Sequence, residues 1–258
     1  MTGFTDLIFD LYGTLVDIHT EEDESVWAAT ADFFRQHGAF YTAEALRQVF
    51  QAQLSIRQAQ AGQSYECFPD IPFHEIMAFL FHEAGIAENA EALGVQAAAL
   101  FRVCSTEYIR LYPQVTEALK QLRRQGYRLW LLSNAQEVFT QQELKQLHMD
   151  ALFDGIYISS RFGFRKPDQR FFRALIEEQH ISPAHCLMIG NDRDTDIAGA
   201  KAAGLATLYM HTNLTPLGQA AADPGLDPRC TAGCRHWEWE GTDWQALTDV
   251  LIAKTAWC

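Results

Sequence analysis

The chain has 258 residues, of which 48% are hydrophobic and 21% charged, and its formal net charge is -13 at pH 7. The acidic balance argues against a nucleic-acid partner, which would need clustered Lys and Arg, but leaves room for a small anionic substrate. We find no apolar run of the roughly 20 residues that a membrane span needs and no basic-then-apolar signal sequence, so we expect a cytoplasmic protein without a membrane partner.

The six cysteines are scattered along the chain without the spacing of a disulfide framework. Reduced thiols of a cytoplasmic protein fit this pattern. Cys230, Cys234 and His236 offer a loose zinc-like spacing, but a second ligand pair is missing. We therefore favour an ordinary packing role for the segment 211–240, whose function the sequence leaves open.

An apolar run at residues 7–9 predicts a buried parallel strand that ends at Asp10. Gly13 then supplies a turn. A carboxylate at the carboxyl end of a first parallel strand lies where open α/β sheets bind their ligands. The alternative is that Asp10 only caps the turn. Three further polar segments follow in order downstream and favour the functional interpretation.

Residues from about 24 to 111 repeat apolar side chains at helical spacing, with no strong strand between them and a fourth helix over 93–109. This pattern predicts a helical cap domain over residues 18–111, inserted into a core formed by residues 1–17 and 112–258. Some cap side chains are candidates for substrate selection, although an ordinary surface or core role is favoured for each: His19, Arg57, Phe68, His74 and His82.

From Pro113 onward, predicted strands alternate with predicted helices. The strands are expected at 127–132, 156–159, 186–189 and 205–210, and a last helix at 244–252. Alternation of this kind predicts an α/β fold with a doubly wound, Rossmann-like parallel sheet.

Several polar side chains follow these strands and should meet at one edge of the sheet: Asp10, Ser133, Lys166, Asp192 and Asp196. An aspartate nucleophile needs hydrogen-bond donors for developing charge, which Ser133 and neighbouring amides can supply. Lys166 can add both a donor and a positive charge. Clustered carboxylates are costly unless they are protonated or bind a cation, and their oxygen atoms suit Mg²⁺.

Four ordered segments resemble the four motifs of the haloacid dehalogenase superfamily of hydrolases: residues 10–14, Ser133-Asn134, Lys166-Pro167-Asp168 and 190–196. The resemblance implies a Rossmann-like core, a type-1 helical cap and a covalent aspartyl intermediate on Asp10. In metal-dependent members the backbone carbonyl of Tyr12 would bind the metal. The implied roles are catalysis by Asp10, Tyr12, Ser133, Asn134 and Lys166, substrate binding by Gly13, Thr14, Ser133, Asn134 and Lys166, and metal binding by Asp10, Tyr12, Asn191, Asp192 and Asp196.

Two positions depart from the phosphatase pattern of that family. Tyr12 stands where phosphatases usually carry an aspartate that protonates the leaving group, a function worth about 10²- to 10⁴-fold in rate. A phenol of pKa about 10 is a poor base at neutral pH. In the fourth motif, either Asn191 or Asp192 takes the position of the usual metal ligand, depending on the alignment.

The DxYGT form of the first motif resembles that of haloacid dehalogenases, which work without metal and need no proton for their leaving group. Asp192, Asp194 and Asp196, together with the segment 159–168, look more like the phosphatase branch. We therefore expect a hydrolase, a Mg²⁺-dependent phosphatase of a small organic phosphate. The alternatives are a metal-independent 2-haloacid dehalogenase and a catalytically impaired binding protein.

Overall fold

The computed structural model describes residues 3–61, 68–219 and 235–253. At its centre lies a six-stranded sheet of strand order β5-β4-β1-β6-β7-β8, in which every neighbouring pair is parallel. The strands are β1 (Asp6–Phe9), β4 (Arg128–Ser133), β5 (Gly155–Ile158), β6 (Cys186–Gly190), β7 (Ala206–His211) and β8 (His236–Glu240). The predicted Rossmann-like α/β sheet is confirmed.

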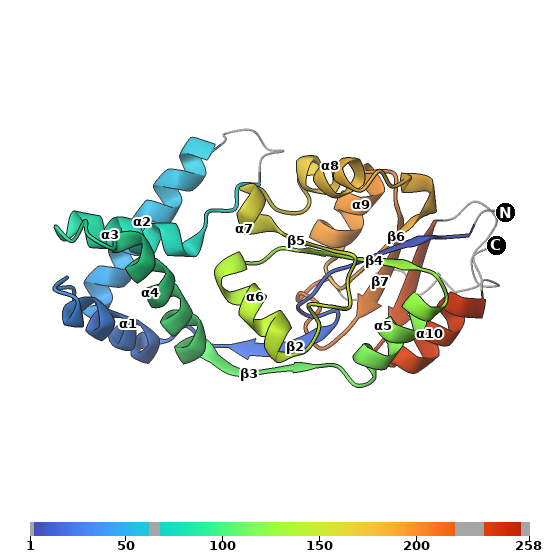
Figure 1. Cartoon of the computed structure of the whole chain (residues 1–258), viewed down its shortest axis with the longest axis horizontal. Helices are drawn as coiled ribbons and strands as arrows, with labels where there is room; N and C mark the ends of the chain where they lie inside the picture. Colours follow the sequence, from blue (N-terminus) through green and yellow to red (C-terminus); the bar gives the residue numbers. More distant parts are fainter. Residues whose placement is uncertain (1–2, 62–67, 220–234, 254–258) are drawn as a thin grey trace.

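Alternate residues of the central strands pack on opposite faces of this sheet, as the period of two requires. In β1, Leu7 and Phe9 belong to one hydrophobic cluster, whereas Ile8 belongs to another. The first cluster includes side chains of α5 (Val115–Arg124), α6 (Glu137–Gln146) and α10 (Trp244–Ala253). The second includes side chains of α8 (Gln169–Glu178) and α9 (Ala198–Ala202). Helices therefore cover both faces, and the sheet is doubly wound (Figure 1).

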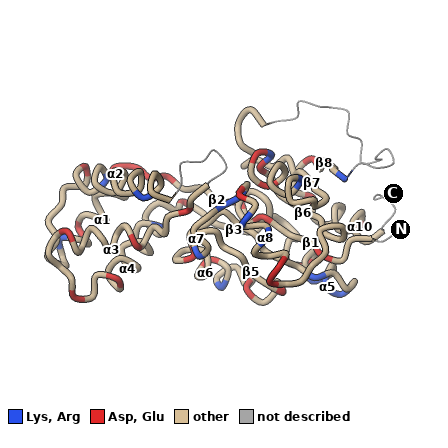
Figure 2. Tube along the Cα trace, turned by 90° about the horizontal axis from the view of Figure 1, so that it is seen from above, with Lys and Arg blue, Asp and Glu red and all other residues tan. Residues whose placement is uncertain are grey.

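A short helix, α7 (Ser159–Phe162), follows β5. Four further helices, α1 (Glu24–Gln36), α2 (Ala43–Ala61), α3 (Phe73–Glu83) and α4 (Ala90–Ser105), gather to one side of the sheet in both views (Figures 1 and 2). They have a hydrophobic cluster of their own, which includes Trp27, Phe34, Phe81 and Phe101. Their amphipathic sequences thus pack against one another and not against the sheet.

An antiparallel two-stranded ribbon of β2 (Val16–Thr20) and β3 (Thr106–Leu111) joins this helical part to the sheet. The expectation that helix extends from 93 to 109 is therefore wrong at its end, because α4 stops at Ser105. β-Branched and aromatic residues in β3, together with the cross-strand partner β2, favour a strand there.

The helical part also contacts the sheet part directly, and two of these contacts involve charged side chains. On α4, the Arg102 guanidinium lies 2.6 Å from Glu143 Oε1 of α6. On the loop before α3, Asp70 accepts hydrogen bonds from the Gln136 amide at 2.9 Å and from the Ser159 hydroxyl. Both contacts join residues that are far apart in the chain.

The tail beyond β7 contains a strand that the sequence pattern did not predict. β8 pairs in parallel with β7 through Thr207–His236 and the positions that follow. His236 lies in this strand and its Nδ1 is 2.7 Å from Thr207 Oγ1, while Cys230 and Cys234 lie outside the described residues. Within the described ranges, no helix is long and apolar enough to cross a membrane.

Candidate active site

The carboxyl ends of β1, β4 and β6 border a cavity of about 200 Å³. Open α/β sheets bind their ligands at this edge. The lining residues are Asp10, Tyr12, Asn134, Lys166, Asn191, Asp192, Thr195, Asp196, Leu214 and Pro216. Three of these side chains are carboxylates and one is an ammonium group.

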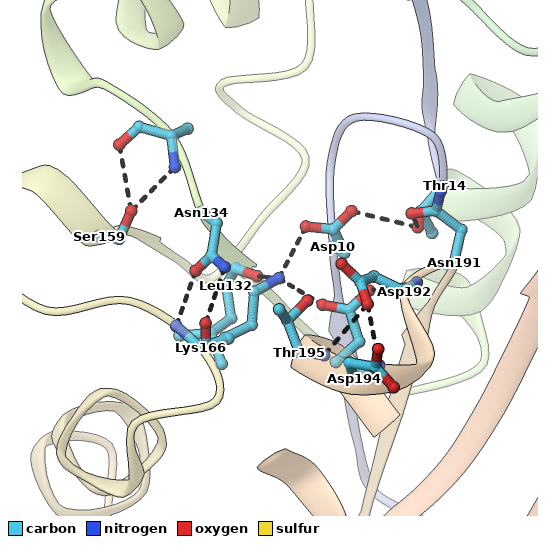
Figure 3. A network of polar contacts seen from close by, with 12 residues as sticks. Asp10, Thr14, Leu132, Asn134, Ser159, Lys166, Asn191, Asp192, Asp194 and Thr195 are labelled. Atoms are coloured by element: carbon cyan, nitrogen blue, oxygen red, sulfur yellow. Dashed lines mark hydrogen bonds and ion pairs between the residues drawn. The ribbon is translucent and has the colours of Figure 1, made fainter. Parts of the chain in front are cut away.

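Lys166 is the central cation of the site and is buried. Its Nζ lies 2.7 Å from Asp10 Oδ1, 2.7 Å from Asp196 Oδ1 and 2.7 Å from the Leu132 carbonyl oxygen (Figure 3). Burial alone would lower the pKa of Lys166, but the two carboxylates raise it overall, so the side chain stays charged. Lys166 thereby holds Asp10 and Asp196 together at the sheet edge.

Asp196 is fully buried, and burial raises its pKa to about 7 in spite of the opposing effect of Lys166. Its Oδ2 accepts a hydrogen bond of 3.0 Å from the Asp192 backbone amide. A side chain at Gly190 would collide with this carboxyl group, so the close approach requires glycine there.

Asn134 fixes the backbone of Lys166 from both sides. Its Oδ1 accepts from the Lys166 amide at 2.8 Å, and its Nδ2 donates to the Lys166 carbonyl at 3.0 Å. Next to it, the Ser133 hydroxyl is buried and has no hydrogen-bond partner among the described residues. A buried hydroxyl without a partner at a strand end suits a ligand oxygen atom.

Thr14 links the first and fourth segments of the site. Its hydroxyl lies 3.3 Å from Asp10 Oδ2 and 3.2 Å from Asn191 Oδ1. Gly13 has a φ of 85°, and a Cβ there would collide with the Asn191 side chain. The nucleophile loop, which we define as residues 10–16, therefore packs closely on Asn191 and needs glycine at position 13.

Asp192 caps the π-helix η2 (Arg193–Ile197) that follows β6. Its Oδ1 accepts from the amides of Asp194 and Thr195 at 2.9 and 3.1 Å and from Gln219 Nε2 at 3.1 Å. One carboxylate oxygen of Asp192 is therefore already engaged by the backbone of η2 and by Gln219.

The Tyr12 side chain leaves the nucleophile loop toward α6. Its hydroxyl donates to Glu143 and lies 3.1 Å from Thr140 Oγ1. Burial, and then the Glu143 charge, raise the pKa of Tyr12 well above its ordinary value. The phenol thus stays protonated and its proton is engaged by Glu143, so it offers no proton to a leaving group in the cavity.

The oxygen atoms of the cavity fit a hard cation of the Mg²⁺ type. Asp10 and Asn191 share the Thr14 hydroxyl, and Tyr12 lines the same cavity. Within the described ranges, no group of three or more His, Cys, Asp or Glu side chains converges to hold a metal. Mg²⁺ usually binds one or two carboxylates and completes its coordination with neutral oxygens, water and substrate, so this donor set still suits it.

None of the cap candidates from the sequence, His19, Arg57, Phe68, His74 or His82, belongs to the cavity lining that the structure describes. Arg57 pairs with Glu75, His82 lies near Glu91 and His19 near Glu107.

The apolar wall of the cavity comes from Leu214 and Pro216, in the tail that sequence reasoning assigned to packing. Their position directly after a core strand, at the same sheet edge, is the signal that could have identified them. The Leu214 carbonyl accepts from Asn191 Nδ2 at 3.0 Å, which ties this loop to the fourth motif.

Residues 7–204 match the family model of haloacid dehalogenase-like hydrolases. The chain therefore belongs to that family and is a hydrolase of the superfamily that the four motifs indicated.

Named relatives of the chain are phosphatases. It is 32% identical over 107 residues to a glyceraldehyde 3-phosphate phosphatase of Methanothermobacter thermautotrophicus, covering 42% of this chain and 47% of the relative. It is 30% identical to a phosphoserine phosphatase of Thermus thermophilus, covering 63% and 62%. A phosphoglycolate phosphatase of Pseudomonas aeruginosa is 28% identical and covered over 75% of its length. The chain thus spans between about half and two thirds of the first two relatives.

Solved structures with a similar fold include dehalogenases. A 2-haloacid dehalogenase from Pseudomonas syringae has a TM-score of 0.62 at 16% identity, with 99% of this chain and 100% of that chain covered. A further dehalogenase has a TM-score of 0.55 at 19% identity, with 98% and 99% covered. At these identities the likeness concerns the fold alone.

Proposed function

We propose that the chain is a Mg²⁺-dependent phosphatase of a small organic phosphate, with Asp10 as the nucleophile. The observation that carries the proposal is Asp10 itself, which lines the cavity and is held by Lys166 at 2.7 Å. The similarity to named phosphatases supports the choice of a phosphate ester over other electrophiles.

In the proposed reaction, an Asp10 carboxylate oxygen attacks phosphorus while the bond from phosphorus to the leaving oxygen breaks. Water then attacks the aspartyl phosphate, which releases inorganic phosphate and restores the carboxylate. Lys166 stabilises negative charge beside Asp10, and the unpaired Ser133 hydroxyl is a donor for a phosphoryl oxygen.

Mg²⁺ would be held by the Asp10 carboxylate, the Tyr12 carbonyl and Asn191, with Asp192 and Asp196 as the other acidic groups of the site. When bound, it would offset the repulsion between the nucleophile and the phosphate. We favour Asn191 over Asp192 as a direct ligand because Asp192 Oδ1 already caps η2.

We further propose that residues 18–111 act as the cap over a core of residues 1–17 and 112–258. The separate hydrophobic cluster of α1–α4 and the ribbon of β2 and β3 support this division.

The Tyr12 contact gives the proposal a specific consequence. Since its phenol donates to Glu143, no acid at position 12 protonates a departing alcohol. The enzyme should therefore prefer aryl and acyl phosphates, whose leaving groups depart without a proton, over alkyl phosphates. The value of kcat/KM across a series of leaving groups tests this, and a flat dependence on leaving-group pKa would contradict it.

The direct experiment measures phosphate release from acetyl phosphate and an aryl phosphate, with Mg²⁺ and with chelator. We expect Mg²⁺-dependent turnover in the wild type and its loss in Asp10→Asn. The matched control is Asp194→Asn, which removes an exposed carboxylate outside the cavity lining and should keep turnover.

A dehalogenase is the second candidate, because the Tyr12 hydroxyl is engaged by Glu143 and displacement of halide from carbon needs no acid. Chloride release from 2-chloropropionate without metal, and no phosphate release, would favour it. A binding protein would release neither product, and Asp10→Asn would keep its ligand affinity.

A further inference from the structure

A buried carboxylate on α6 joins the helical part of the chain to the nucleophile loop. Glu143 is 7% exposed. It accepts the Tyr12 hydroxyl on one side, and on the other it is bound by Arg102 through Nε at 2.6 Å and Nη2 at 3.3 Å. Tyr12 is two residues after Asp10, whereas Arg102 belongs to α4.

The Arg102 guanidinium also lies over the Tyr12 ring, 5.5 Å from its centroid, and over the Phe139 ring at the same distance. Thr140 Oγ1 lies 3.1 Å from the phenol. The three side chains of Tyr12, Glu143 and Arg102 thus form one network, which we name the α4–α6 bridge. It is assembled from the nucleophile loop, α6 and α4.

In this network Tyr12 needs Glu143 as the acceptor of its hydroxyl, and Glu143 needs Arg102 as its cation. A carboxylate as buried as Glu143 requires a cation, and Arg102 supplies it. Without α4 in contact with α6, the charge of Glu143 would be left without that cation. The carboxylate that accepts the Tyr12 hydroxyl would then need another partner, such as water, and the geometry around Tyr12 would change.

The nucleophile loop is also anchored away from α6, because the Leu15 carbonyl accepts from the Tyr112 amide at 3.1 Å and the Gly13 carbonyl accepts from the Thr212 hydroxyl at 2.7 Å. Its amides at Thr14, Leu15 and Val16 bond back to the Leu11 carbonyl at 3.3, 2.8 and 2.9 Å. The Tyr12 side chain connects this turn to α6. The second contact of the helical part, at Asp70, reaches Gln136 and Ser159 and involves no residue of the loop.

We propose that Arg102 and Glu143 are positioning residues that act through Tyr12 and hold the nucleophile loop in place only while α4 is packed on α6. Cap position and nucleophile geometry are then coupled by this bridge. The coupling is a property of the fold and does not depend on which electrophile Asp10 attacks.

The test is hydrogen exchange at the amides of Thr14, Leu15 and Val16, measured without substrate. In Arg102→Met we expect about tenfold faster exchange at these amides, because the local opening becomes less costly. Arg102→Lys restores a cation and should return part of the protection. Arg57→Met is the matched control, since it removes an Arg–Glu pair within the helical part and should leave the loop amides unchanged.

Two further measurements distinguish an effect of the α4–α6 bridge on the loop amides from general destabilisation of the fold. Amides of the core strand β6 report global opening, so equal acceleration at Leu187 and Ile189 would overturn the proposal. Tyr12→Phe removes only the hydroxyl, and adding Arg102→Met to it should then accelerate loop exchange no further. Additive effects, or loop amides that do not respond to Arg102→Met, would also overturn it.

Glu143→Gln keeps the shape of the network without the charge and provides the same test if Arg102→Met fails to fold. We expect the loop amides to exchange faster than in the wild type here as well, while unchanged exchange contradicts the proposal. Because this readout needs no turnover, its failure is distinguishable from failure of the proposed phosphatase activity.

Discussion

Replacement of Lys166 by methionine tests how the site is held together. Methionine nearly matches the length of the aliphatic chain but removes the ammonium that contacts Asp10, Asp196 and the Leu132 carbonyl. Removing one partner of a buried ion pair typically costs about 3–5 kcal/mol, because the other charge is left buried and unpaired. Two carboxylates lose their cation here. Burial already raises the pKa of Asp196 to about 7, so this carboxyl group can take up a proton. We therefore expect Lys166→Met to lower the free energy of unfolding by about 3–5 kcal/mol.

The assay is denaturant unfolding followed by tryptophan fluorescence, since Trp130 and Trp244 are buried in the core. The control is Lys120→Met on the exposed face of α5, where the pair with Glu117 should contribute under about 1 kcal/mol. The double variant Lys166→Met/Asp196→Asn removes one unpaired charge and should regain at least about 1 kcal/mol over the single variant. A cost below about 1 kcal/mol for Lys166→Met, or a double variant as unstable as the single one, would refute this account of the site.

Three further predictions concern the surroundings of the site and the helical part. Asp168 caps α8 by accepting from the Arg170 amide at 2.9 Å, so Asp168→Ala should cost about 1–2 kcal/mol in thermal or denaturant unfolding, while Asp168→Asn retains much of the cap. Burial alone would raise the pKa of Asp168, but its hydrogen bonds with Arg170 lower it overall. Its charge should therefore stabilise the fold fully above about pH 4 and progressively less as the pH falls through the folded-state pKa, a dependence that Asp168→Asn should remove. Gly94→Ala should destabilise by about 1–3 kcal/mol in spite of the better helix propensity of alanine, because the new Cβ would lie 2.6 Å from the His74 carbonyl and 2.7 Å from the Ala78 amide. The exposed Gln96→Ala on the same helix should change stability by less than about 0.5 kcal/mol, and equal effects at the two positions would contradict the packing argument. Tyr12→Asp should raise turnover of alkyl phosphates relative to aryl phosphates, because a shorter acid no longer reaches Glu143, and no change in that ratio would argue against the role we give to position 12.

Much of the sheet could be predicted because its strands are short apolar runs that end in polar residues. In β1 and β6, every residue is buried, and the polar group follows at once. Three strands were not predicted, β2, β3 and β8. In β8 the sequence His-Trp-Glu-Trp-Glu is half polar, and its strand character depends on pairing with β7, which no local pattern reveals.

In the site, too, the residues that directly follow strands could be predicted, whereas contacts between residues far apart in the chain could not. Asp10, Lys166 and Asp196 could be placed together because each follows a predicted strand of one parallel sheet. The partners of Tyr12 could not be predicted, because Glu143 and Arg102 lie 131 and 90 positions away and reach it only through packing of α4 on α6. The contribution of Leu214 and Pro216 likewise depends on how a tail without periodicity folds back over the sheet edge.

The ribbon of β2 and β3 has a consequence for how such a chain can diversify. Thr20 pairs with Thr106, and the Glu21 amide donates to the Ser105 carbonyl at 2.7 Å, so the helical insertion begins and ends at neighbouring points. An insertion with adjacent ends can change in length at little entropic cost, roughly 0.6 kcal/mol for each doubling. Recombination that exchanges residues 22–104 for an unrelated segment would therefore keep the ribbon and the sheet, but it would remove Arg102 and with it the cation of Glu143. A new segment that keeps the nucleophile loop in place would have to bring a cation of its own to Glu143, so the length of the insertion can vary more freely in evolution than its contact with α6.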